Sequence, residues 1–115
     1  MVTPLQGEIW WAQMRVPQGS EPGYRRPVVV VQGDALNRSG IDTVVCVPLT
    51  SNRKWEVAPG NVLLSSSTSG LPKPSVANAL QLVALNKSRL TERVEKLPGR
   101  VFDQVMAGVD IVLGR

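Results

Sequence analysis

The segment that most restricts the fold of this chain is the stretch 26–32, RPVVVVQ, which contains four consecutive valines. Valine is β-branched and favours strands, and an unbroken apolar run has no polar side to leave in water. Pro27 is tolerated because the first residues of a strand can do without a ladder hydrogen bond. We therefore expect residues 26–32 to form a strand that is covered on both faces.

Apolar periodicity predicts further strands, separated by polar stretches rich in proline, glycine and serine. The expected strands are residues 7–14, 43–49, 61–64 and 75–85. The stretches between them are predicted as a loop at 15–24, a connection with one helical turn at 33–42, a loop with some extended structure at 50–60, a turn region at 65–74, and a helical turn plus a short strand at 86–97.

The C-terminal stretch has a helical period instead. Val101, Val105 and Val109 are among the apolar residues that recur there at helical spacing, and Pro98 suits the first turn of a helix. The pattern predicts a helix over 98–113 whose apolar stripe is core or an oligomer contact. Several short strands and one terminal helix favour a mainly β fold, a small, curved, antiparallel barrel with a C-terminal helix.

Length and composition fit one domain over residues 1–115. The chain has 115 residues with 43% apolar content, enough for a single core, and its net charge of +4 favours an anionic partner. The N-terminal sequence has no leader pattern, and no apolar run approaches the roughly 20 residues that span a bilayer. We expect a soluble, cytoplasmic protein with no membrane association.

The residue types that are missing narrow the chemistry. The chain has no histidine, which removes the commonest general base and every histidine-containing metal site. Its one cysteine, Cys46, excludes an internal disulfide and is expected to be a buried structural thiol. We therefore expect no metal and no cofactor.

Two of the predicted strands bring useful side chains together. If residues 26–32 and 43–50 pair as an antiparallel hairpin, the start of the first strand lies opposite the end of the second, so Arg26 and Thr50 become neighbours. The even-numbered residues of each strand share one face, but the register decides whether those two faces coincide. A fixed cation and a hydroxyl at one rim, beside the loop at 15–25, predict a phosphate site.

The same residues also have structural interpretations. Arg25 or Arg26 can pair with Glu21, and the Thr50 hydroxyl can cap the turn that follows it. Trp10 and Trp11 point to opposite faces of their strand, so one is expected in the core and the other at a dimer contact or under a nucleobase. The remaining basic residues, Arg53, Lys54, Arg89, Arg93 and Lys96, are expected on a solvated face.

Four stretches resemble the PemK/MazF family of toxins from type II toxin–antitoxin systems, which are mRNA interferases. They are GEIWWAQM, GSEPGYRRPVVVVQGD, VPLTSN and GLPKPSVANALQLVALNKSRLTERV. The most specific part is a Gly-Ser-Glu loop that leads to Arg-Pro and a valine run, followed about twenty residues later by Pro-x-Thr. The likeness extends from about Gly7 to the final helix.

This resemblance implies an SH3-like barrel of the CcdB/MazF type that forms a homodimer and cleaves single-stranded RNA. It also implies a cognate MazE-like antitoxin whose acidic C-terminal segment covers the RNA groove. Arg26 and Thr50 match the catalytic pair of the family, and Glu21 matches its loop glutamate. The residues expected to bind RNA are Gly19, Ser20, Tyr24, Arg25, Ser51, Asn52 and Gln81. Where many relatives have acidic residues, this chain has Pro74, Leu80 and Asn86.

Cleavage without a metal uses the 2′-hydroxyl as the nucleophile, so the expected products carry a 2′,3′-cyclic phosphate and a 5′-hydroxyl. Arg26 is assigned to charge stabilisation with acid catalysis as a second role, Thr50 to phosphate binding, and Glu21 to proton removal or to orienting the arginine. Two alternatives remain: a non-catalytic, CcdB-like toxin that binds a protein such as DNA gyrase, and a decayed toxin that retains only antitoxin binding.

Overall fold

The valine run forms β2 (Arg25–Val30), whose residues Val28, Val29 and Val30 have no accessible surface. The computed structural model describes residues 2–14 and 24–115. Strand β2 pairs antiparallel with β1 (Glu8–Gln13) on one side and with β3 (Thr43–Thr50) on the other. The prediction of a doubly covered strand at this position is confirmed, as is its hairpin with β3.

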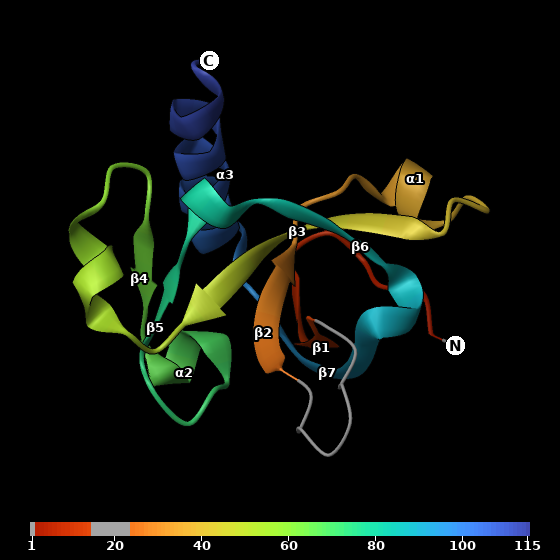
Figure 1. The fold of residues 1–115 in the computed structure, drawn as a ribbon, viewed down its shortest axis with the longest axis horizontal. Helices are drawn as coiled ribbons and strands as arrows, with labels where there is room; N and C mark the ends of the chain where they lie inside the picture. Colours follow the sequence, from red (N-terminus) through yellow and green to blue (C-terminus); the bar gives the residue numbers. More distant parts are fainter. Residues whose placement is uncertain (1, 15–23) are drawn as a thin grey trace.

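The strands form a seven-stranded antiparallel sheet in the order β4-β5-β3-β2-β1-β7, with β6 also paired to β3. The remaining strands are β4 (Val62–Leu64), β5 (Ser75–Ala77), β6 (Val83–Asn86) and β7 (Leu90–Lys96). The sheet curls into a half-barrel, as the ring of ribbons in Figure 1 shows. The mainly antiparallel fold with a C-terminal helix is therefore confirmed.

Six helices and helical turns join or follow these strands in the described part of the chain. They are α1 (Asp34–Asn37), η1 (Arg53–Val57), α2 (Ser66–Ser69), η2 (Ala79–Gln81), η3 (Lys87–Arg89) and α3 (Gly99–Leu113). The expected extended structure at 50–60 is wrong, because η1 occupies it. Asn52 caps η1 by accepting a hydrogen bond from the Lys54 amide at 3.2 Å, which favours a helical turn over a strand.

The single strand expected at 75–85 is also wrong. A continuous ladder from the Leu49–Ala77 pair would set Cys46 opposite Leu80, whereas Cys46 pairs with Val83. The three residues of η2 are therefore looped out between β5 and β6, and Leu80 within it is 52% exposed. Apolar pattern alone cannot reveal such a detour, because the neighbouring strand sets the register.

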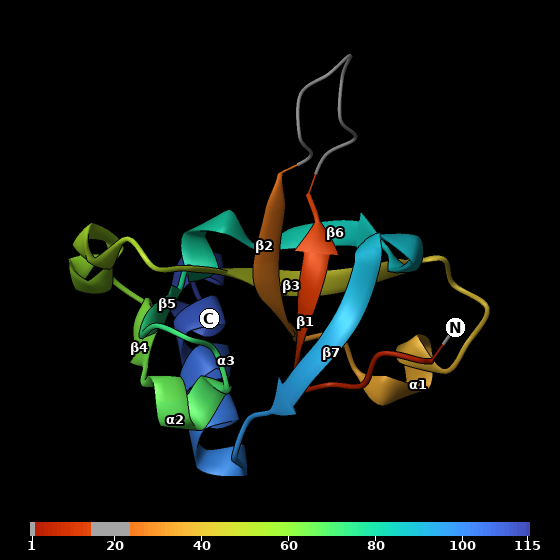
Figure 2. The same ribbon diagram turned by 90° about the horizontal axis from the view of Figure 1, so that it is seen from below.

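Two hydrophobic cores cover the two faces of β2. The first joins Ile9, Val29 and Val47 to the buried stripe of α3, and the second joins Trp10 and Val30 to their neighbours on the other face. Helix α3 lies with β4, β5 and α2 at one end of the molecule, away from α1 and the N-terminus, in both views (Figures 1 and 2). The predicted helix at 98–113 is confirmed with Pro98 as its N-cap.

Two glycines allow α3 to touch the turn before β4. A Cβ atom added at Gly108 would lie 1.9 Å from the Gly60 carbonyl oxygen, and one added at Gly60 would lie 2.8 Å from the Gly108 carbonyl oxygen. Gly60 also has a φ of +87°, which side-chain-bearing residues rarely adopt. Both positions therefore require glycine for the helix to pack this closely on the sheet.

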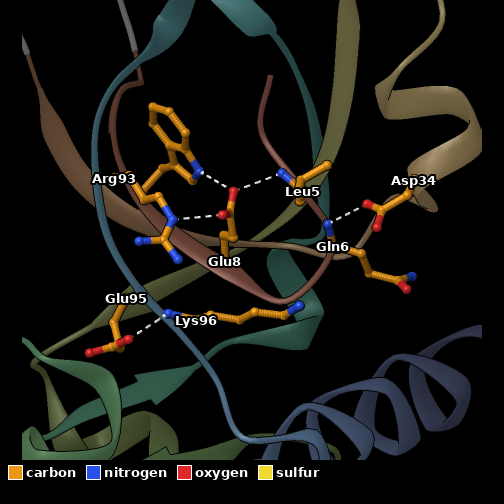
Figure 3. A network of polar contacts seen from close by, with 8 residues as sticks. Leu5, Gln6, Glu8, Asp34, Arg93, Glu95 and Lys96 are labelled. Atoms are coloured by element: carbon orange, nitrogen blue, oxygen red, sulfur yellow. Dashed lines mark hydrogen bonds and ion pairs between the residues drawn. The ribbon is translucent and has the colours of Figure 1, made fainter. Parts of the chain in front are cut away.

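A buried carboxylate ties β1 to β7 and to the N-terminal segment (Figure 3). Glu8 accepts hydrogen bonds from Arg93 Nε at 2.6 Å, from the Leu5 amide at 2.8 Å and from Trp10 Nε1 at 3.1 Å. Burial alone would raise the pKa of Glu8, but these hydrogen bonds outweigh it, and the pKa lies below its ordinary value. Glu8 therefore stays ionised and holds the scaffold on the side of β1 that faces β7.

Cys46 lies in the second hydrophobic core. Cys46 is fully buried, and burial raises the pKa of its thiol to about 12, so it is the structural thiol that was expected. Within residues 2–14 and 24–115, no helix is both long and apolar enough to cross a membrane.

Candidate functional site

The start of β2 and the end of β3 form one rim of the sheet. Val28 pairs with Pro48 and Val30 pairs with Cys46, so the same register continued by two residues sets Arg26 across from Thr50. Because the pairs join even-numbered residues to even-numbered residues, the two faces coincide. Arg26 and Thr50 also line the same cavity, which agrees with the predicted proximity of the two residues.

A cavity of about 380 Å³ opens at this rim. Its walls come from β1, from the beginning of β2, from the end of β3 and from the segment between α2 and β5. The lining residues are Trp11, Tyr24, Arg25, Arg26, Pro27, Leu49, Thr50, Ser51, Leu71, Pro72, Lys73 and Ser75. Three cations and no carboxylate are among these described lining residues, so the cavity suits an anionic ligand.

Arg26 is half-buried and lies over the ring of Tyr24, with its guanidinium carbon 4.7 Å from the ring centroid. Burial lowers the pKa of the Arg26 guanidinium from its ordinary value, because desolvation disfavours the charged form. The ion pairs among the described residues give Arg26 no carboxylate partner. Its charge is therefore not neutralised by that part of the protein.

Arg25, the neighbouring residue in the chain, makes different contacts from Arg26. Its guanidinium carbon lies 4.4 Å from the centroid of the Trp11 ring, and its Nη2 lies 3.2 Å from Glu92 Oε2. Neighbouring strand residues point to opposite faces, so the two arginines diverge from one another. The predicted division between them has a structural basis, with Arg25 paired to a carboxylate and Arg26 stacked on a tyrosine.

The sequence left two interpretations of the Thr50 hydroxyl open, a turn cap and a phosphate-binding group, and the structure is compatible with both at once. Thr50 Oγ1 accepts a hydrogen bond from the Asn52 amide at 3.1 Å, which is the turn-capping contact expected of a structural threonine. A hydroxyl oxygen that accepts one hydrogen bond retains its own proton for donation. Thr50 can therefore close the turn and still donate to an oxygen in the cavity.

The other predicted site residues fall into three groups. Tyr24, Arg25 and Ser51 line the cavity together with Arg26 and Thr50. Asn52 and Gln81 do not line it: the first caps η1, and the second ends η2 and is exposed. Gly19, Ser20 and Glu21 lie outside the described residues.

Seven of the twelve described lining residues were not among the predicted site residues, and two of these, Lys73 and Trp11, bear on ligand binding. Lys73 stands between two prolines in the segment that forms the far wall, and no sequence signal connects that segment to the start of β2. The sequence predicted one core ring and one outer ring in the tryptophan pair without assigning them: Trp11 is half-buried, whereas Trp10 is 5% exposed and belongs to the second core. The predicted split between a core ring and an outer ring is confirmed.

Within the described residues, no three His, Cys, Asp or Glu side chains gather as a group that could hold a metal ion. The site as described consists of guanidinium, ammonium and hydroxyl donors around an aromatic and aliphatic floor. Such a set can bind a phosphate diester, stabilise additional negative charge on it and pack against the attached bases.

Comparison with known proteins assigns the family. Residues 5–113 match the model of the PemK-like, MazF-like toxin of type II toxin–antitoxin systems. Endoribonuclease MazF2 of Mycobacterium bovis is 43% identical over 108 residues, which is 94% of this chain and 95% of that protein. Endoribonuclease MazF9 of Mycobacterium tuberculosis is 38% identical over 112 residues, 94% of this chain and 91% of that protein.

Solved structures agree with this assignment. A crystal structure of MazE–MazF from Deinococcus radiodurans superposes with a TM-score of 0.82 at 27% identity, covering 99% of this chain and 98% of that one. A crystal structure of MazF from the same organism gives a TM-score of 0.79 at 27% identity over the whole of both chains. This chain therefore belongs to the PemK-like, MazF-like toxins of type II toxin–antitoxin systems.

Proposed function

We propose that this chain is a toxin endoribonuclease that cleaves single-stranded RNA at the rim cavity. The observation that carries the proposal is the placement of Arg26 and Thr50 on neighbouring strands, where both line one cavity that has cations and no described carboxylate. The relatives whose names describe them as endoribonucleases cover nearly the whole chain, which supports the same activity.

The proposed reaction needs no metal. The 2′-oxygen of the nucleotide attacks the adjacent phosphorus while its proton passes to a base, and the bond from phosphorus to the 5′-oxygen breaks as that oxygen takes up a proton. The products carry a 2′,3′-cyclic phosphate and a 5′-hydroxyl. Holding the three reacting atoms in line and stabilising the charge on the phosphorane-like transition state supply most of the acceleration.

Arg26 is assigned to the developing charge. A guanidinium matches two phosphate oxygens with two parallel N–H donors, and Arg26 has no described carboxylate that competes for them. Its lowered pKa also makes it a better proton donor to the leaving oxygen than an exposed arginine. The Thr50 hydroxyl donates a hydrogen bond to a non-bridging phosphate oxygen, while its own oxygen continues to accept the hydrogen bond from the Asn52 amide.

The remaining roles rest on the family resemblance. Glu21 is assigned to removing the 2′-hydroxyl proton or orienting Arg26, with Gly19 and Ser20 shaping the same loop. Tyr24, Arg25 and Ser51 are assigned to RNA contacts inside the cavity, and Asn52 and Gln81 to contacts outside its lining. Bases splayed over these loops would give the cleavage its sequence preference.

The proposed partners follow from the same surface. A homodimer and a cognate MazE-like antitoxin are proposed, and the antitoxin's acidic segment would be attracted by Arg25, Arg26 and Lys73. The Deinococcus radiodurans structure of MazE–MazF, at 27% identity, supports an antitoxin of this class.

The proposal is tested by incubating the purified protein with a long single-stranded RNA in EDTA and mapping new 5′-hydroxyl ends. Discrete ends paired with 2′,3′-cyclic phosphates are expected. Intact RNA would contradict the proposal, and intact RNA together with inhibited DNA supercoiling would indicate the CcdB-like alternative.

A further inference from the structure

Trp11 lies between the first hydrophobic core and the rim cavity. The side chain is half-buried, it packs against the first hydrophobic core, and it also lines the rim cavity. Part of the indole therefore borders the cavity. The guanidinium of Arg25 covers one face of the ring, with its central carbon 4.4 Å from the ring centroid.

The distance excludes a second planar group between Arg25 and Trp11. Stacked planar groups need a separation of roughly 3.5 Å between each pair of layers, so a base inserted between them would require about twice that gap. Arg25 is thus a cover on the ring and not the upper half of a clamp. A planar ligand reaches Trp11 only when Arg25 moves aside.

Glu92 on β7 holds this cover. Trp11 pairs with Glu92 in the ladder between β1 and β7, and Arg25 lies diagonally across β1 on the same face, so its Nη2 reaches Glu92 Oε2 at 3.2 Å. The side chains of Arg25 and Glu92 are 46% and 68% exposed. Ion pairs this open to water contribute little to stability, so the contact opens readily.

The surroundings favour a nucleobase as the group that replaces Arg25. The described walls of the cavity carry Arg26 and Lys73 and no carboxylate, while Pro27 and Leu71 supply apolar surface beside the indole. Cations that follow a phosphate backbone next to an aromatic platform are the general pattern for single-stranded nucleic acid binding. Once displaced, Arg25 stays within reach of the phosphate attached to that base.

We propose that Trp11 is a nucleobase-stacking subsite, closed in the free protein by Arg25, with Glu92 as the latch that holds Arg25 in place. The inference rests on the proposed endoribonuclease function and adds to it a base-binding position and the device that covers it. Arg25 and Glu92 are positioning residues here, and Trp11 is the residue that touches the base.

The direct test labels the full chain with 5-fluorotryptophan, which gives one fluorine resonance for each of Trp10, Trp11 and Trp55. The probes are a single-stranded DNA oligomer of mixed sequence, which lacks the 2′-hydroxyl and is not cut, and an oligomer of the same length with abasic sugars. The Trp11 resonance is expected to shift with the first oligomer and not with the second. A bound base-containing oligomer that leaves Trp11 unmoved would overturn the proposal, as would equal shifts with both.

The Trp11→Leu variant tests the same subsite by affinity. Loss of one stacked base is expected to weaken binding of the base-containing oligomer by about 5- to 100-fold, with the affinity for the abasic oligomer unchanged. A merely structural role would weaken both equally and would overturn the proposal. Trp55→Leu is the matched control. Like Trp11, Trp55 is half-buried and lies under a cation, in its case Lys54, but it does not line the cavity.

The Glu92→Gln variant tests the latch without disturbing a packed residue. Release of Arg25 is expected to raise the binding preference for the base-containing over the abasic oligomer by about 2- to 5-fold. This factor corresponds to the free energy that an exposed ion pair contributes. Glu95→Gln removes the same charge from β7 and is expected to leave the preference unchanged. An equal change of this preference in both variants would show that Glu92 does not hold Arg25 over Trp11.

Cleavage of a long RNA by the wild type separates this inference from the proposed function. If the RNA is cut while Trp11 shows no base-dependent response, only the stacking subsite is wrong. If the RNA remains intact, the endoribonuclease proposal fails and the stacking subsite is rejected with it.

Discussion

Strand β7 carries two neighbouring residues, Glu92 and Arg93, that form opposite kinds of ion pair. Arg93 binds Glu8 at 2.6 Å, and the Glu8 side chain is 8% exposed and accepts two further hydrogen bonds. Glu92 binds Arg25 at 3.2 Å with both side chains open to water. The first pair links β1, β7 and the N-terminal segment, whereas the second holds a cation at the cavity through a contact that is open to water. Adjacent positions on one strand thus serve the scaffold and the site separately.

The largest difference is expected in stability. Glu8→Ala leaves the Trp10 indole N–H and the Leu5 amide without their acceptor, so the free energy of unfolding should fall by about 3 kcal/mol. Glu92→Ala should lower it by about 0–1 kcal/mol. Urea denaturation of both variants measures this, and similar losses would remove the distinction between the two pairs.

Thr50→Ala tests whether Thr50 contributes to RNA cleavage and not only to the fold. Loss of one donor to the transition state should lower the cleavage rate by about 10²-fold. The variant should keep its fold, because the turn loses only the hydrogen bond from the Asn52 amide. RNA cleavage under single-turnover conditions gives the rate, and Arg115→Ala, which changes an exposed residue of the C-terminus paired with Asp110, is the control that should remain at the wild-type rate.

The ion pair between Glu8 and Arg93 should also affect how the stability depends on pH. The folded pKa of Glu8 lies below its ordinary value of about 4.3, so its contribution is complete above that value. As the pH falls through the folded pKa, the unfolded state binds the proton more readily and the contribution is lost. The stability advantage of the wild type over Glu8→Gln should therefore hold from about pH 7 down to about pH 4.3 and shrink as the pH falls from there to about pH 3. A constant difference over this range would contradict the assignment.

The smallest effect is expected at the far wall of the cavity. Lys73→Ala should weaken RNA binding a few-fold and lower the slope of log affinity against log salt by about 0.7, the value for one phosphate contact on a single strand. The cleavage rate at saturating RNA should stay near the wild-type rate. An unchanged salt dependence would remove Lys73 from the binding surface.

Local patterns in the sequence predicted the parts of the fold that depend on local physics. The valine run, the β2–β3 hairpin and the period of α3 were all visible, and with them the proximity of Arg26 to Thr50. The looped-out η2 was not, because the register of β3 creates it.

The missed parts of the site have the same cause. Arg25 and Glu92 lie 67 residues apart in the chain, and Lys73 reaches the cavity only through the fold of the segment after α2. Contacts of this kind depend on how distant strands pair, which single-sequence patterns do not encode. The pair formed by Arg26 and Thr50 was therefore readable from the sequence, but the cavity wall opposite them was not.

We propose that the two adjacent arginines have separate roles, with Arg26 acting in the chemical step and Arg25 in binding. The most direct measurement compares Arg26→Ala and Arg25→Ala in single-turnover cleavage of a long RNA across a range of protein concentrations. Arg26→Ala should lose at least about 10²-fold in the rate at saturation, whereas Arg25→Ala should mainly shift the concentration needed to reach saturation. Full activity in Arg26→Ala, or equal losses at saturation in both variants, would contradict the account.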